Sequence, residues 1–236
     1  MEGIYHVLSR GVDKRKIFLD DQDYLRFIHD LFEFNDQLAA INTGFWFRQR
    51  QFSGLQSRYS RYFEQEEERE KRKFLVNILA FCLVPNHYHL LLTPVVEGGM
   101  TDFMRKLNVG YAKYFNQKYK RVGVLFQSRY KSIIITQESH FIHLPYYIHL
   151  NPLDLEFSEW REGELKNYKE AMRFLEHYRW SSFLDYIGKS NFPSVTQREF
   201  LLEFLGGSEQ YKKDTLDWLK GRGRFYIERV GDVILE

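Results

Sequence analysis

The chain has 236 residues, 44% of them hydrophobic, so it can bury the core of one sizeable domain, alone or with an appendage. Its single cysteine, Cys82, excludes an intrachain disulfide and fits a reducing compartment. The first residues do not resemble a secretory signal, and no apolar run is long enough to span a membrane. The net charge of +2 favours no class of partner, and we expect a soluble, cytoplasmic protein.

The first third of the chain predicts a strand, a helix and a charged segment. Residues 4–10 form a short apolar run that ends at Gly11 and predicts a strand. Asp20 or Asp21 can cap a helix running to about Gln37. Residues 45–73 are dense in charge and end in an acidic and basic tract. We interpret them as an insertion, helical or partly disordered.

The middle of the chain predicts the rest of a sheet. Residues 74–84 are apolar and partly β-branched, Pro85-Asn86 predicts a turn, and residues 87–93 predict a returning strand. The following elements are a helix from 100 or 101 to 118, extended segments at 124–127 and 130–136, and a helix from 139 to about 150. This order predicts an α+β fold with an antiparallel sheet and helices mainly on one face.

The sequence changes character after Pro152. Acidic residues come first, and further helices are predicted around 180–187, 197–204 and 208–219. We therefore divide the chain into a domain of residues 1–155, which carries the insertion, and a mostly helical extension of residues 156–236.

Basic residues are concentrated between Phe103 and Gln137, a window without Asp or Glu. Its basic residues are Arg105, Lys106, Lys113, Lys118, Lys120, Arg121, Arg129 and Lys131. This segregation of charge favours a polyanionic partner over a merely solvated face. Arg129 and Lys131 alternate with Tyr130 in a predicted extended segment, where they would share a face and contact phosphates. Arg10, Lys14 and Arg15 form a second candidate phosphate cluster.

Two histidines and a tyrosine suggest a reactive centre. His87 and His89 are two residues apart in a predicted strand, so both imidazoles point the same way and can share a divalent cation. Tyr147 and Asn151 are four residues apart on one face of a predicted helix. If that helix crosses the sheet face bearing the histidines, Asn151 is a candidate third ligand and Tyr147 lies beside the metal.

This arrangement suits transesterification of a phosphodiester. A bound metal acts as a Lewis acid on a phosphate oxygen. Tyr147 would attack phosphorus, giving a covalent phosphotyrosine and a free 3′-hydroxyl. The phenol must lose its proton as it attacks, and the sequence does not identify the group that accepts it.

Five stretches of the chain resemble the single-tyrosine transposases with a His-hydrophobic-His motif, of the IS200-like and especially the REP-associated type. These stretches are YHVLSRGVDKRKIF (5–18), LVPNHYHLLL (83–92), GVLFQSRYKS (123–132), YIHLNPL (147–153) and YRWSSFLDYIG (178–188). The combination of PNHYHLLL with YIHLNP makes the resemblance specific, whereas either piece alone is not.

The resemblance implies a role for each central residue: His87 and His89 bind the metal, Asn151 completes the site, and Tyr147 is the nucleophile. It also implies a ferredoxin-like palm that binds single-stranded or hairpin DNA. We expect Mg²⁺ or Mn²⁺, no small-molecule cofactor, no membrane partner, and a monomer or homodimer. Pro145 lies inside the predicted helix and tends to kink it, so the adjoining Tyr146 is the competing nucleophile.

Two other functions stay open at this stage. One is a non-catalytic protein that binds structured nucleic acid on the same palm. The other is a metal hydrolase that activates water, forms no covalent intermediate and tolerates Tyr147→Phe.

Overall fold

The structure, a computed structural model, describes residues 3–38, 72–163, 165–222 and 231–235. The predicted insertion at 45–73 lies outside these residues, apart from its last two positions. No helix within the described ranges is long and apolar enough to cross a lipid bilayer.

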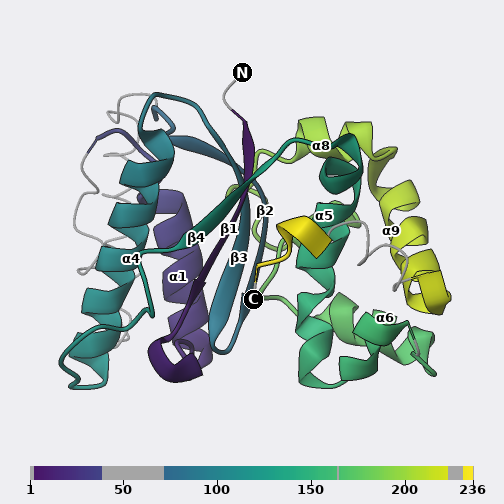
Figure 1. The fold of residues 1–236 in the computed structure, drawn as a ribbon, viewed down its shortest axis with the longest axis horizontal. Helices are drawn as coiled ribbons and strands as arrows, with labels where there is room; N and C mark the ends of the chain where they lie inside the picture. Colours follow the sequence, from purple (N-terminus) through teal and green to yellow (C-terminus); the bar gives the residue numbers. More distant parts are fainter. Residues whose placement is uncertain (1–2, 39–71, 164, 223–230, 236) are drawn as a thin grey trace, which may run out of the picture.

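A four-stranded antiparallel sheet forms the centre of the fold (Figure 1). The elements in chain order are β1 (Ile4–Arg10), α1 (Asp21–Glu33), β2 (Val76–Val84), β3 (His87–Pro94), α4 (Gly99–Lys118) and β4 (Lys131–Ile135). The strands lie in the order β2-β3-β1-β4. This β-α-β-β-α-β arrangement is ferredoxin-like. The predicted α+β fold with an antiparallel sheet is confirmed.

The boundaries follow local signals. Helix α1 begins where the side chain of Asp20 accepts a hydrogen bond from the backbone nitrogen of Asp23, a standard N-terminal cap. The helix ends at Glu33, four residues before the predicted end. The extended segment predicted at 124–127 contributes only an isolated bridge between Phe126 and Gly11.

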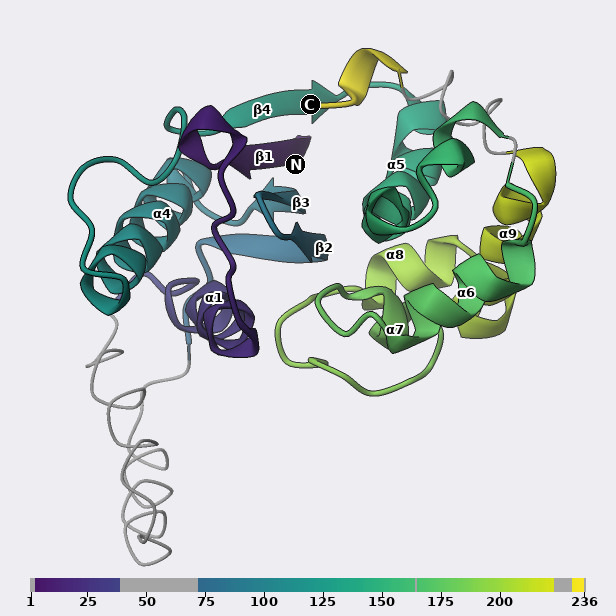
Figure 2. The same cartoon turned by 90° about the horizontal axis from the view of Figure 1, so that it is seen from below.

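Helices cover both faces of the sheet (Figure 2). Helices α1 and α4 pack on one face, as predicted for the palm, over a core that includes Phe27, Leu90 and Phe103. The other face is covered by α5 (Glu138–Leu150) and the helices that follow it. The expectation of helices mainly on one face therefore holds for α1 and α4 and not for the rest.

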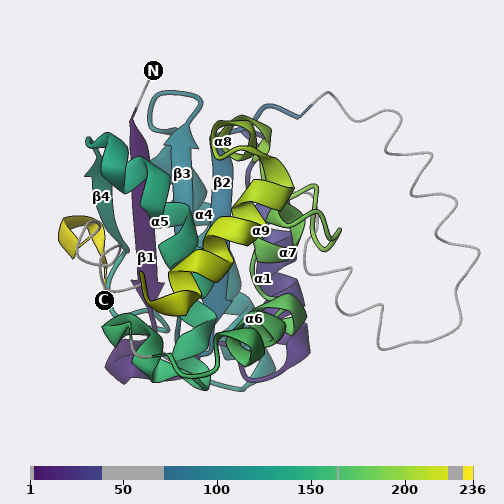
Figure 3. The same cartoon turned by 90° about the vertical axis from the view of Figure 1, so that its right-hand side faces the viewer.

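The later helices lie around α5, and α9 crosses nearest the viewer in Figure 3. They are α6 (Tyr168–His177), α7 (Phe183–Tyr186), α8 (Glu199–Phe204) and α9 (Gly207–Asp217). Helix α6 was not predicted, although Asn167 caps it by accepting from the nitrogen of Glu170. The predicted helix at 180–187 is only the four residues of α7.

Short helical segments connect these elements: η2 (Asn151–Leu155), η3 (Ser158–Glu162) and η5 (Gly231–Val233). Helix α5 shares one buried core with Phe183, Tyr211 and Trp218. The predicted domain boundary at residue 155 thus falls between elements that share a core, and the division stays a prediction.

Candidate active site

Strand β3 carries His87 and His89 on the sheet face that α5 covers, because alternate side chains of a strand point the same way. The centres of their imidazole rings lie 4.9 Å apart. His89 is buried, and His87 is half-buried beside the β2–β3 turn, where its Nδ1 lies 2.6 Å from Asn86 Oδ1. Arg10 is the neighbour of His87 across the sheet.

Both imidazoles are held in the neutral form. Burial, with a further contribution from the charge of Arg10, lowers the pKa of His87 to about 3. Burial also lowers the pKa of His89 well below its usual value. A neutral imidazole has the free lone pair that a metal ion requires, so the electrostatics of the face suit coordination.

Helix α5 brings Tyr147 to the histidines. The Tyr147 side chain is fully buried, and its ring centre lies 6.0 Å from that of His89 in an edge-on arrangement. Asn151 comes one helical turn later. Its Nδ2 donates a hydrogen bond of 2.8 Å to the backbone carbonyl of Tyr147. The tyrosine, the amide and the histidine pair therefore meet in one place.

The neighbouring Tyr146 points away from the histidines, although α5 contains Pro145. Its ring stacks on Tyr211 at 4.4 Å between centres, and its hydroxyl donates to Asp214 at 3.2 Å. These contacts lie among the later helices. The helical geometry thus brings Tyr147 to the candidate site and leaves Tyr146 in the core.

Arg161, on η3, covers the tyrosine. Its Nη1 donates to the Tyr147 hydroxyl at 3.3 Å, its Nη2 donates to Asn151 Oδ1 at 3.3 Å, and the guanidinium lies over the Tyr147 ring. Asp154 holds the same guanidinium through contacts of 2.8 Å and 2.6 Å and accepts a hydrogen bond from Trp160. The pKa of Arg161 is raised despite burial, because Asp154 and Tyr147 stabilise its charge.

Among the described residues, one buried nitrogen of the histidine pair has no hydrogen-bond partner. His89 Nε2 is buried and unpaired within the described residues, which costs about 1–3 kcal/mol unless something satisfies it. No group of three or more His, Cys, Asp or Glu side chains there is arranged to hold a metal. A cation held by the two histidines and the amide oxygen of Asn151 fits the nitrogen and oxygen donors that are present.

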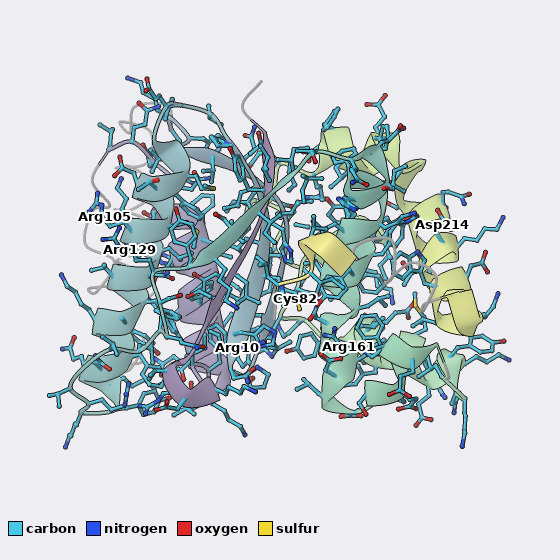
Figure 4. The ribbon with its side chains drawn as sticks, viewed as in Figure 1. Arg10, Cys82, Arg105, Arg129, Arg161 and Asp214 are labelled. Atoms are coloured by element: carbon cyan, nitrogen blue, oxygen red, sulfur yellow. The ribbon has the colours of Figure 1, made fainter. Side chains whose placement is uncertain are left out.

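The predicted DNA-binding residues fall into two groups. Arg10 ends β1 beside His87, and the loop with Lys14 and Arg15 packs on the β2–β3 turn through Asn86 and Pro85. Lys14 is exposed and Arg15 half-buried. Figure 4 shows Arg10 at the same end of the molecule as Arg161. This first group therefore lies at the candidate site.

The second group lies on the α4 side of the molecule. Arg105 is exposed on α4 and pairs with Asp102, and both Arg105 and Arg129 lie away from Arg161 (Figure 4). Arg129 precedes β4, which begins at Lys131. The prediction that Arg129 and Lys131 share one strand face is therefore wrong. Both are exposed, and their contact with DNA stays a prediction.

Three residues of this site were not predicted: His6, Asp154 and Arg161. His6 Nε2 lies 2.9 Å from His89 Nδ1, and its ring centre is 6.3 Å from that of Tyr147. The sequence did offer a signal for His6. This histidine lies four residues before Arg10 in the same strand, so both side chains point to one face of the sheet, and Arg10 is the neighbour of His87. Arg161 had no such signal, because it reaches Tyr147 from a separate short helical turn.

The stretch that carries the histidine pair, Tyr147 and Asn151 resembles a known protein family. Residues 46–151 match a protein-family model described as "Transposase IS200 like". This stretch, slightly less than half of the chain, is therefore similar to the IS200-like transposases that the motifs resemble.

One solved structure is described as a REP-associated tyrosine transposase bound to a REP hairpin. It is 13% identical to this chain over 83% of this chain and 86% of that one, with a TM-score of 0.46. No curated protein matches the chain.

Proposed function

We propose that this protein is a metal-dependent single-strand DNA endonuclease and strand transferase that acts through Tyr147. The observation that carries the proposal is the unpaired, buried Nε2 of His89 next to the ring of Tyr147. A buried polar atom without a partner is expected where a ligand completes the site.

The proposed reaction is an exchange of phosphodiester partners. Tyr147 Oη forms a bond to phosphorus, the bond from phosphorus to the 3′ oxygen breaks, and that oxygen leaves as a 3′-hydroxyl with a proton from solvent. The phenol proton leaves as the new bond forms. The product is a 5′-phosphotyrosine, which a second 3′-hydroxyl can attack in the reverse sense, so strands are joined without ATP.

A divalent cation, Mg²⁺ or Mn²⁺ in our proposal, would supply Lewis-acid stabilisation of the phosphate when held by His87, His89 and Asn151. Arg161 has a distinct task. Because Tyr147 has no exposed surface, attack requires that the guanidinium give way. The scissile phosphate is an anion, so it would attract the Arg161 guanidinium away from the Tyr147 hydroxyl. Asp154 would keep the guanidinium aligned.

Single-stranded DNA, folded as a hairpin, is the proposed substrate. Arg10, Lys14 and Arg15 lie at the same end of the sheet as His87 and would contact its phosphates. Arg105, Arg129 and Lys131 would contact a more distant part of the strand.

A denaturing gel tests the proposal. Labelled single-stranded hairpins from the sequence flanking the gene are incubated with Mn²⁺ or Mg²⁺ and with wild type, Tyr147→Phe or Tyr146→Phe. We expect a metal-dependent, protease-sensitive slow band with wild type and Tyr146→Phe and none with Tyr147→Phe.

The other outcomes contradict the proposal. Cleavage that survives in Tyr147→Phe without a slow band would indicate attack by water. Tight hairpin binding without cleavage by wild type would favour a non-catalytic nucleic-acid-binding protein.

A further inference from the structure

His6 is a buried histidine that the proposed reaction does not use. It lies on β1, and its ring stacks on that of His89 with 5.1 Å between centres and 20° between planes. Its Nε2 lies 2.9 Å from His89 Nδ1. Its other nitrogen, Nδ1, lies 2.7 Å from the backbone carbonyl oxygen of Val233, which is 227 residues away in the sequence. Both ring nitrogens of His6 are therefore engaged.

These two contacts determine where the protons lie. A carbonyl oxygen only accepts, so His6 Nδ1 must carry a proton and donate it to Val233. His6 is fully buried, and its ring hydrogen-bond partners among the described residues, the Val233 carbonyl and His89, include no carboxylate that would stabilise a second proton. His6 Nε2 is then an acceptor, and the donor facing it is His89 Nδ1.

His89 is likewise buried, with no carboxylate among its ring hydrogen-bond partners in the described residues, so with a proton on Nδ1 it has none on Nε2. That nitrogen is the buried atom without a partner. A histidine that carries its proton on Nε2 cannot coordinate an ion through that nitrogen. The hydrogen bond that His89 Nδ1 donates to His6 therefore selects the tautomer that can coordinate an ion through Nε2.

His6 itself is not a candidate ligand in this arrangement. Its lone pair on Nε2 accepts from His89, and Val233 occupies the other nitrogen. Val233 belongs to η5, which packs beside β4 near the sheet (Figure 2). A peptide segment far from the histidine pair in sequence thus anchors its orientation.

We propose that His6, held by the Val233 carbonyl, is a positioning residue that keeps His89 in the tautomer with a bare Nε2 and so raises the affinity of the site for a divalent cation. The inference rests on the proposed metal site, but its first half concerns protons that can be observed without metal. Losing such an outer partner of a metal-ligating histidine typically lowers metal affinity about 10–100-fold.

Two substitutions separate this role from simple packing. His6→Leu removes the acceptor facing His89, whereas His6→Gln can still offer an amide oxygen there. His140→Leu is the matched control, because His140 is a buried histidine in the first turn of α5, about 16 Å along the helix from Asn151. Thermal unfolding identifies any variant that fails to fold.

The measurements are imidazole ¹⁵N spectra of the metal-free protein and calorimetric titration with Mn²⁺ alone. We expect His89 to be protonated on Nδ1 and bare on Nε2 in wild type, and to lose that single state in His6→Leu. Mn²⁺ affinity should fall about 10–100-fold in His6→Leu and stay near wild type in His6→Gln and His140→Leu.

Three results would overturn the inference: a proton on His89 Nε2 in wild type, a folded His6→Leu with wild-type Mn²⁺ affinity, or no Mn²⁺ binding by wild type. The DNA reaction is not part of the experiment. Failure to form a phosphotyrosine would therefore remove the proposed function and leave the His6 result standing.

Discussion

The two faces of the central sheet are built from the same strands and differ in chemistry. Towards α1 and α4, β3 presents Tyr88, Leu90 and Leu92, which pack in an aromatic and aliphatic core. Towards α5, the alternate positions of the same strand present His87 and His89. The first face keeps the fold together by apolar burial, which contributes roughly 25 cal/mol per Å².

The second face gives up part of that stabilisation. It buries imidazoles, and His89 has a ring nitrogen that no group in the described part of the chain contacts by a hydrogen bond. Proteins rarely keep such groups unless a ligand or a reaction uses them. Because successive side chains of a strand point to opposite faces of the sheet, β3 contributes to stability on one face and to the candidate active site on the other.

Substitutions at two adjacent positions of β3 should give the largest effects and test this contrast between the two faces. His89→Leu replaces the imidazole by an apolar side chain of similar size, so the fold should persist while metal-dependent cleavage falls about 10³-fold or more. Leu90→Ala on the opposite face should lower the free energy of unfolding by about 2–5 kcal/mol. Cleavage rates and urea unfolding measure both. A His89→Leu protein that still cleaves would break the contrast.

Arg161 should give the next largest effect. Arg161→Gln removes the positive charge over Tyr147 and the ion pair with Asp154, so the rate of adduct formation should fall on the order of 10²-fold. Arg179, which is exposed and lies over the ring of Trp180, provides the matched control. Single-turnover kinetics of Arg161→Gln and Arg179→Gln separate the two. Equal rates would show that Arg161 only packs.

The two groups of basic residues should differ more modestly. Lys14→Ala, at the active-site end, should weaken hairpin binding and reduce the dependence of log affinity on log salt by about one unit. Arg105→Ala should have a smaller effect, because Arg105 pairs with Asp102 on the α4 side. Titrations at several salt concentrations compare them. A larger loss in Arg105→Ala would move the DNA path to α4.

Tyr146→Phe should have the smallest effect. The change keeps the stacking on Tyr211 and removes the hydrogen bond to Asp214, so the free energy of unfolding should fall by about 0.5–1.5 kcal/mol. Adduct formation should be unchanged. Thermal unfolding and the gel assay measure the two properties, and a loss of adduct in a stable protein would contradict the assignment of Tyr147.

Much of the fold follows from local patterns in the sequence. The short run of residues 4–10 that ends at Gly11, and the apolar run before Pro85-Asn86 with its returning segment, predicted β1, β2 and β3 to within about two residues. The order of elements predicted the sheet. The position of α5 on the face opposite α1 could not be predicted, because it depends on packing against Phe183, Tyr211 and other residues of later helices.

In the candidate site, too, the sequence predicted the contacts within one element and not those between elements. Spacing alone brings His87 near His89 and Tyr147 near Asn151, because each pair belongs to one element. Contacts between different elements could not be predicted from the sequence. His6 of β1 contacts His89 of the adjacent strand β3, and Arg161 contacts Tyr147 from η3. Periodicity within a strand or helix carries no information on such distant partners.

The most direct test of the proposed mechanism identifies the residue that joins DNA to protein. The covalent adduct is digested with trypsin, and the peptide of residues 132–161, which contains both Tyr146 and Tyr147, is fragmented in a mass spectrometer. We expect a nucleotide phosphate on Tyr147 alone. A phosphate on Tyr146, or cleaved DNA with an unmodified peptide, would contradict it.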